Sequence, residues 1–205
     1  TLMETIKRRL KKDQIPSMSL NNLAEGGMGS IDSMLFYHQA DLAANMVSAS
    51  EGEGLRITMG RFFRNIDNFV RTGRDGAHPM DELDLYAVLN QSDAEYQKQK
   101  ENLHEKLGEC QERWLFFDAC DSGASIDVVR EFKDVFNLIM TPEGMHGKDV
   151  YIIVSANSFE MARGERCYDV SIGKFCTFDS YNEYEKVILA SREKKDKRVY
   201  NDDED

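Results

Sequence analysis

Two short apolar runs with an amphipathic stretch between them constrain the fold of this chain more than any other feature. The runs are 114–117 (WLFF) and 151–154 (YIIV). Between them, residues 128–140 carry apolar side chains at helical spacing: Val128, Phe132, Val135, Phe136 and Ile139. Strands that are apolar throughout are typical of a parallel sheet covered on both faces, and a strand, a helix and a second strand form a βαβ unit. The pattern predicts an α/β fold with a parallel sheet core.

The remaining elements flank this unit. We expect a basic helix over 1–13, a helix from Ser30 or Asp32 to about Met46, and a helix over 50–70 with one apolar stripe at Leu55, Met59, Phe62, Ile66 and Phe69. Residues 71–80 are rich in turn formers, and 81–112 are helical in pattern but polar nearly all round, which is typical of a projecting arm. A hairpin over 168–178, with Gly173 in its turn, and a last helix opened by Ser180 and Glu183 complete the chain.

Composition narrows the function classes. The 205 residues include 26 Lys and Arg against 37 Asp and Glu, so the net charge is −11 and nucleic acid is possible as a partner but not indicated. No apolar run is long enough for a bilayer, and the basic start lacks a signal peptide's apolar region, so we expect a cytoplasmic protein away from membranes. The cysteines show no C-x-x-C spacing, so reduced thiols are expected and a zinc site is not.

Three separated features carry candidate chemistry. Asp118 follows an apolar strand, and a carboxylate at the end of a parallel strand points into the crevice where α/β proteins bind ligands. There it can hold Mg²⁺ through water; capping the next helix is the alternative, but Ser125 or Asp127 can do that. Residues 48–54 (SASEGEG) suit either a simple helix cap or an anion site at a helix N-terminus. Asn157 suits either a turn or the orientation of a phosphate or water.

Taken in order, these features resemble the C-terminal half of a soluble ABC-type ATPase, in the branch related to chromosome-maintenance and recombination ATPases. The family's signature motif resembles residues 50–53 (SEGE), its Walker B strand 115–118 (LFFD), its D-loop 122–125 (SGAS) and its switch region 155–158 (SANS). The resemblance covers roughly residues 48–66 and 114–190. It implies one α/β P-loop ATPase lobe over 1–205 in which 71–112 are a helical insertion, since Ser50 and Asp118 are 68 positions apart.

The resemblance also implies the site residues. ATP would be bound by Ser50, Gly52, Glu53, Ser122 and Ser125. Asp118 would hold Mg²⁺, while Asn157 and the position of Ala119 would take the catalytic places. ATP would lie between two chains, so the chain would form a homodimer or a larger ring.

The chain departs from the family pattern at several positions. No phosphate-binding motif occurs in it, and the family's order places that loop upstream of Thr1. Asn157 stands where a histidine is usual, and Ala119 stands where the family has its catalytic glutamate. Because a methyl group cannot accept a proton from water, hydrolysis is expected to fail while MgATP binding persists. Ala119 is then either an introduced substitution that traps an ATP-bound assembly or a natural loss.

The expected function is conformational control of a protein effector through MgATP, in antiviral defence or in DNA maintenance and repair. One alternative is a non-hydrolysing ATP-binding scaffold that uses residues 71–112 for protein contacts. A plain α/β interaction domain, with a chance match to the motifs, is the other alternative.

Overall fold

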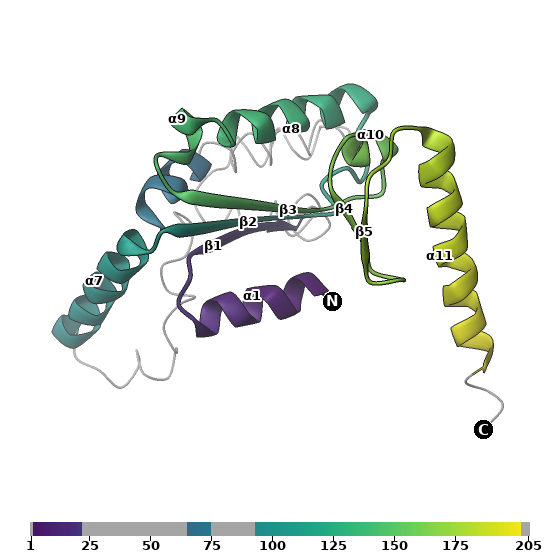
Figure 1. The fold of residues 1–205 in the computed structure, drawn as a ribbon. Helices are drawn as coiled ribbons and strands as arrows, with labels where there is room; N and C mark the ends of the chain where they lie inside the picture. Colours follow the sequence, from purple (N-terminus) through teal and green to yellow (C-terminus); the bar gives the residue numbers. More distant parts are fainter. Residues whose placement is uncertain (1, 22–64, 75–92, 202–205) are drawn as a thin grey trace, which may run out of the picture. The chain divides into compact units, whose positions relative to one another are not determined.

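The computed structural model describes residues 2–21, 65–74 and 93–201, which belong to two compact units, Thr1–Ser155 and Ala156–Asp205 (Figure 1). The helix expected between Ser30 and Met46, the first part of the helix expected over 50–70, and the turn-rich residues 75–80 lie outside the described residues.

A parallel sheet forms the centre of the first unit. Within the described residues it contains β1 (Ser17–Asn21), β2 (Glu112–Asp118) and β3 (Asp149–Ser155), in the order β1-β2-β3. Asn21, Asp118 and Ser155 are in register at the carboxyl ends of these strands. The predicted α/β class and parallel sheet are confirmed. Strand β1 was not anticipated.

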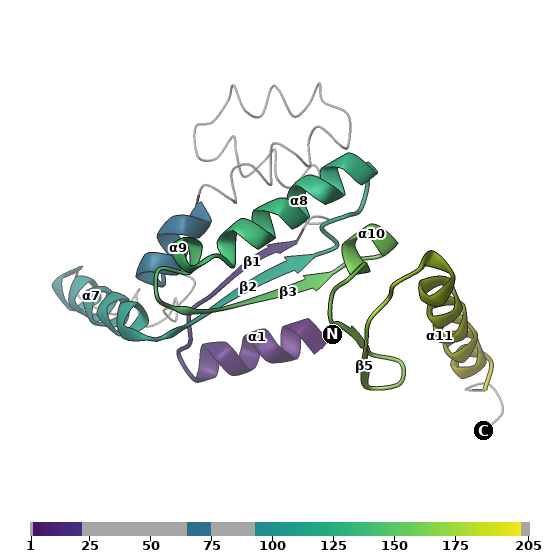
Figure 2. The same ribbon diagram turned by 45° about the horizontal axis from the view of Figure 1, so that its top comes forward.

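Helices cover both faces of the sheet. The Phe117 ring contacts the ring of Phe136 on α8 (Ile126–Ile139), with centroids 4.6 Å apart. The Lys7 ammonium of α1 (Leu2–Lys12) lies 5.7 Å from the centroid of the Phe116 ring. Because successive strand residues point to opposite faces, α8 and α1 lie on opposite sides of β2, as Figure 2 shows. The helices predicted over 1–13 and 128–140 are therefore confirmed, with slightly shifted ends.

Strand β3 is less buried than predicted. Tyr151 is 43% exposed, residues 152–154 are half-buried, and Val150 is the one side chain of the strand classed as buried. The reason is position: β2 has a neighbour on each side, whereas β3 lies at the edge of the described sheet. Tyr151 is instead stacked on Trp114, with ring centroids 4.4 Å apart.

Residues 65–72 and α7 (Asp93–Glu109) flank the gap in the described chain before α7. The short helix buries Ile66 and Phe69, as the apolar stripe predicted, and also buries Val70. By contrast, α7 buries only Leu107 among its described side chains, in agreement with its polar sequence. Both segments meet at Gly73, where a Cβ atom would lie 2.5 Å from the Leu107 carbonyl oxygen.

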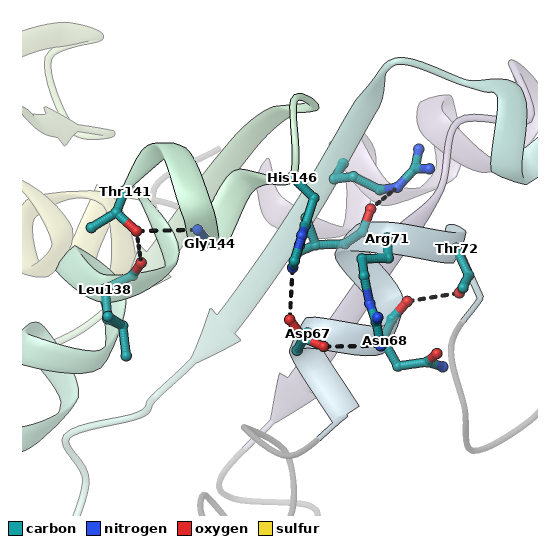
Figure 3. Close-up of polar contacts among 10 residues, drawn as sticks. Asp67, Asn68, Arg71, Thr72, Leu138, Thr141, Gly144 and His146 are labelled. Atoms are coloured by element: carbon teal, nitrogen blue, oxygen red, sulfur yellow. Dashed lines mark hydrogen bonds and ion pairs between the residues drawn. The ribbon is translucent and has the colours of Figure 1, made fainter.

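Arg113 joins these segments to β2. Its guanidinium is fully buried and donates to the carbonyl oxygens of Val70 at 2.9 Å and Gly108 at 3.2 Å. A second link comes from the turn after α9 (Pro142–Met145), where His146 Nε2 lies 2.7 Å from Asp67 Oδ1 (Figure 3). Helix 65–72 is thus held at both its carboxyl end and its exposed side.

The second unit contains α10 (Phe159–Ala162), an antiparallel hairpin of β4 (Cys167–Asp169) and β5 (Lys174–Cys176), and α11 (Tyr181–Asn201). Gly173 in the hairpin turn has φ +68°, which confirms the predicted turn. Ser180 Oγ accepts from the Glu183 backbone N–H at 3.4 Å, so the predicted cap is present. Across the described residues, no helix has both the length and the apolar content that a bilayer span requires.

Candidate functional site

The candidate site lies at the carboxyl edge of the sheet, where β2 ends at Asp118. Asp118 is half-buried and stands between Asn21 and Ser155 in the strand register. It is therefore the last residue of the middle strand of the described sheet. Since ligands of α/β proteins bind outside the carboxyl ends of the strands, Asp118 has the position that such a site requires.

The chain turns sharply directly after Asp118. Ala119 has φ +51°, in the left-handed region that non-glycine residues adopt at a cost of roughly 1–2 kcal/mol. Its carbonyl oxygen accepts from the Ser122 N–H at 3.0 Å, and the Asp121 carbonyl oxygen accepts from the Ala124 N–H at 3.2 Å. Two successive turns thus shape residues 119–124. A strained backbone of this kind clusters at functional sites, which supports a role for this loop beyond chain reversal.

Two carboxylates act on the same buried thiol in this loop. Cys120 is fully buried, and Asp121 is only 8% exposed. Burial, followed by the charges of Asp121 and Asp118, raises the pKa of Cys120 to about 12. Cys120 is therefore a neutral packing residue at physiological pH. The smaller contributions of Asp121 and Asp118 to this pKa come from their negative charges near the end of β2.

Asp121 was missed as a candidate by the sequence analysis. The family resemblance gave this position no role, and the pattern alone does not separate a buried loop carboxylate from an exposed one. The spacing between Asp118 and Asp121 was the available signal, because three residues of a tight turn can bring both carboxylates to one place.

The two serines predicted to contact ATP, Ser122 and Ser125, differ in their surroundings. Ser125 is the N-cap of α8, with its Oγ accepting from the Val128 N–H at 3.5 Å, and Ser122 is half-buried within the turn. The capping alternative weighed for Asp118 is therefore met by Ser125. Ser125 is exposed, so its cap does not prevent contact with a ligand.

The structure does not determine where the other predicted residues lie relative to this edge. Ser50, Gly52 and Glu53 lie outside the described residues. Asn157 belongs to the second unit, where it is exposed and its carbonyl oxygen accepts from the Tyr184 hydroxyl. Ser158 caps α10 by accepting from the Glu160 N–H at 3.2 Å. The capping alternative thus applies to Ser158, whereas the Asn157 side chain stays a candidate.

Asp118 is a described residue that can serve a cation at this edge, and the charge of Asp121 acts on the neighbouring Cys120 thiol. Among the described residues, no group of three or more His, Cys, Asp or Glu side chains is arranged to hold a metal ion. A single carboxylate suits Mg²⁺ that arrives with nucleotide phosphates and keeps several waters, rather than a cage built wholly from protein.

Comparisons with known proteins give no relative. No protein-family model matches the chain, and the searches of curated proteins and of solved structures find no match.

Proposed function

We propose that this chain is part of an ABC-type P-loop ATPase that binds MgATP at a composite interface between two copies. Asp118 contributes to Mg²⁺ binding at one half of the interface. Ser50, Gly52 and Glu53 bind the phosphates of the ATP held mainly by the other copy. Ser122 and Ser125 contact the nucleotide from the D-loop, and Asn157 lies in the switch region.

The observation that carries the proposal is the position of Asp118 at the carboxyl end of β2, followed by a left-handed turn. The parallel strands, the helices on both faces and the capped start of α8 all support a nucleotide-binding edge at this point. A strand of an interaction domain would need neither a half-buried carboxylate nor a strained backbone there. For this reason, the proposal has support beyond the family resemblance.

Ala119 makes this chain a weak ATP hydrolase under the proposal. A general base contributes typically 10²- to 10⁴-fold to a rate, and alanine supplies none. MgATP then acts as a persistent interface ligand, and nucleotide loss rather than hydrolysis separates the copies. Such an assembly suits control of a protein effector, either in antiviral defence or in DNA maintenance and repair.

A non-hydrolysing scaffold is the second candidate function, and α7 favours it. Most side chains of this helix are exposed or half-buried, and Leu107 and the contacts of Arg113 secure its carboxyl end to β2. A helix with so little to bury within its own unit has a surface available for a protein partner. In this version ATP stabilises the assembly, and residues 71–112 bind the effector.

Nucleotide-dependent association of the full-length protein tests the proposal. Light scattering should report a larger species with MgATP than with either ATP and EDTA or MgADP. Ser50→Arg should abolish the increase, since it places bulk at the phosphate position, while Ser19→Arg on β1 provides a control substitution away from the motif. An unchanged size with MgATP, together with no MgATP binding, would rule the ATPase out.

A further inference from the structure

The hairpin of the second unit places two cysteines directly opposite each other. Cys167 of β4 and Cys176 of β5 are register partners in the antiparallel ladder. Opposed residues of such a ladder have Cα atoms about 4.5–5.5 Å apart and side chains on one face. Disulfides require Cα atoms about 4.4–6.8 Å apart, which opposed strand residues satisfy. Their spacing in the sequence, which matches no redox motif, conceals this arrangement.

The side-chain contacts agree with the register. Cys176 Sγ lies 3.8 Å from the backbone oxygen of Cys167, so this thiol is turned toward the opposite strand at the height of its partner. Cys167 Sγ lies 3.6 Å from the carbonyl oxygens of both Ala162 and Glu165. Rotation of the Cys167 side chain about its Cα–Cβ bond is the movement that bond formation needs. Both side chains are half-buried rather than sealed in a core, so a small oxidant can reach them.

The opposite face of the hairpin holds the strands in this register. Tyr168 and Phe175 are packed edge to face, with ring centroids 5.1 Å apart. The Arg166 guanidinium lies 4.0 Å from the centroid of the Phe175 ring. A slip of one residue would separate these rings and place the two thiols on opposite faces of the hairpin. The aromatic pair therefore maintains the thiol pair.

We propose that Cys167 and Cys176 form a reversible, redox-sensitive disulfide that responds to small-molecule disulfides. One cysteine thiolate attacks a sulfur of glutathione disulfide, forming a mixed disulfide and releasing one glutathione thiolate. The second cysteine thiolate then attacks the protein sulfur of that mixed disulfide and releases the second glutathione. The two protein thiols lose two protons and two electrons, and one glutathione disulfide becomes two glutathione thiols.

Partial exposure makes this pair a switch rather than a structural bond. Partly exposed disulfides are the easily reduced ones, so a reducing glutathione pool would open it. Burial, and then the Asp169 carboxylate, raise the pKa of the Cys176 thiol. Cys176 is therefore a slow nucleophile. Closure would tie the strands that lead from α10 to α11 into one fixed loop. The inference is independent of ATP.

The test exposes the full-length protein to glutathione buffers of graded oxidised-to-reduced ratio. Acid quenching, alkylation with N-ethylmaleimide and peptide mass spectrometry then give the fraction of linked Cys167 and Cys176. The same chain in urea is the matched control, since it keeps the sequence separation but loses the register. The native pair should be half oxidised at a ratio at least about tenfold lower than in urea. Cys110→Ser, which removes a half-buried thiol of the first unit, should leave this ratio unchanged.

Single variants identify the chemistry. Cys167→Ser and Cys176→Ser should each retain a mixed disulfide with glutathione on the remaining cysteine, because the second step is lost. The proposal would be overturned if the native wild-type protein kept mixed disulfides without forming the link. A native ratio no lower than the ratio in urea would overturn it equally, because the ladder would then contribute nothing.

Discussion

Replacing Arg113 by methionine should loosen the base of the α7 arm while leaving the sheet folded. The guanidinium is fully buried and donates to four carbonyl oxygens, at 2.9 Å to Val70, 2.6 Å to Cys110, 2.8 Å to Glu112 and 3.2 Å to Gly108. Val70 lies in the last turn of helix 65–72, Gly108 lies in the last turn of α7, and Cys110 directly follows α7. One side chain therefore satisfies the carboxyl ends of two helices from the first residues of β2.

The expected loss follows from which carbonyls keep a partner. Lys148 Nζ also donates to Gly108 at 3.0 Å and to Cys110 at 3.1 Å, so those two oxygens stay bonded in Arg113→Met. The oxygens of Val70 and Glu112 lose their contact with Arg113, and a buried acceptor left unpaired costs about 1–3 kcal/mol. Removing a buried charge offsets part of this, since burial lowers the pKa of Arg113. We expect a net loss of about 2–4 kcal/mol.

Lys148→Met is the matched control, because both of its acceptors keep Arg113 and the loss should be only about 0.5–1 kcal/mol. Urea unfolding is followed by the fluorescence of Trp114, the single tryptophan, which stacks on Tyr151. Amide exchange should quicken in residues 65–72 for Arg113→Met but not for Lys148→Met. Equal losses of unfolding free energy in the two variants, or unchanged exchange in 65–72, would refute the clamp.

Three further predictions concern the loop and the arm. Ala119→Gly should raise the unfolding free energy by about 0.5–1 kcal/mol, because glycine removes the penalty of the left-handed φ. Ala119→Glu in the full-length protein should raise the rate of single-turnover ATP hydrolysis by about 10²- to 10⁴-fold, with little change in ATP affinity. Because the pKa of Cys120 is raised in the folded state, the unfolded chain loses this proton first, and the unfolding free energy should fall as the pH rises from about 9 towards 12. In urea titrations between pH 8 and about 10.5, Cys120→Ala should show a flatter decline of the unfolding free energy than the wild type. Parallel declines in the two proteins would contradict the raised pKa of Cys120. Replacing residues 75–105 by a Gly/Ser linker, which spares Gly73 and Leu107, should retain MgATP binding but lose effector capture in a pull-down; a chain that unfolds instead would show that the arm belongs to the core.

Those strands of the sheet whose side chains are buried were predictable, because burial requires an apolar sequence. Phe116 and Phe117 place apolar side chains on opposite faces of β2 because helices cover both sides of this strand, and the apolar run in the sequence shows this directly. Strand β1 alternates serine with Met18 and Leu20, and two buried side chains are too few to distinguish a strand from a loop. The exposure of Tyr151 depends on strand order, which local pattern does not encode.

The candidate site was predictable only where a strand end determines it. The apolar run before Asp118 predicts that this residue ends a strand. The left-handed φ of Ala119 carries no sequence signal, since alanine is not a residue typical of left-handed turns. Asp121 and Arg113 are buried by contacts that residues 119–124 and the end of α7 make in the folded chain, and the local sequence does not show these contacts. The Cys167–Cys176 pair depends on hairpin register, which four turn residues set and no cysteine spacing reveals.

Magnesium-dependent ATP affinity in an Asp118→Asn variant of the full-length protein tests the central claim most directly. Asp149→Asn is the matched control, because Asp149 is also a strand residue but lies at the opposite, amino end of β3. Titration calorimetry with ATP, at fixed Mg²⁺ and again with EDTA, measures the contribution of the metal to affinity. We predict that Asp118→Asn lowers MgATP affinity by about 10- to 100-fold, as for other carboxylates that orient a metal's ligands, and leaves the metal-free affinity unchanged. Wild-type affinity for MgATP in Asp118→Asn, or an equal loss in Asp149→Asn, would contradict a nucleotide site at the end of β2.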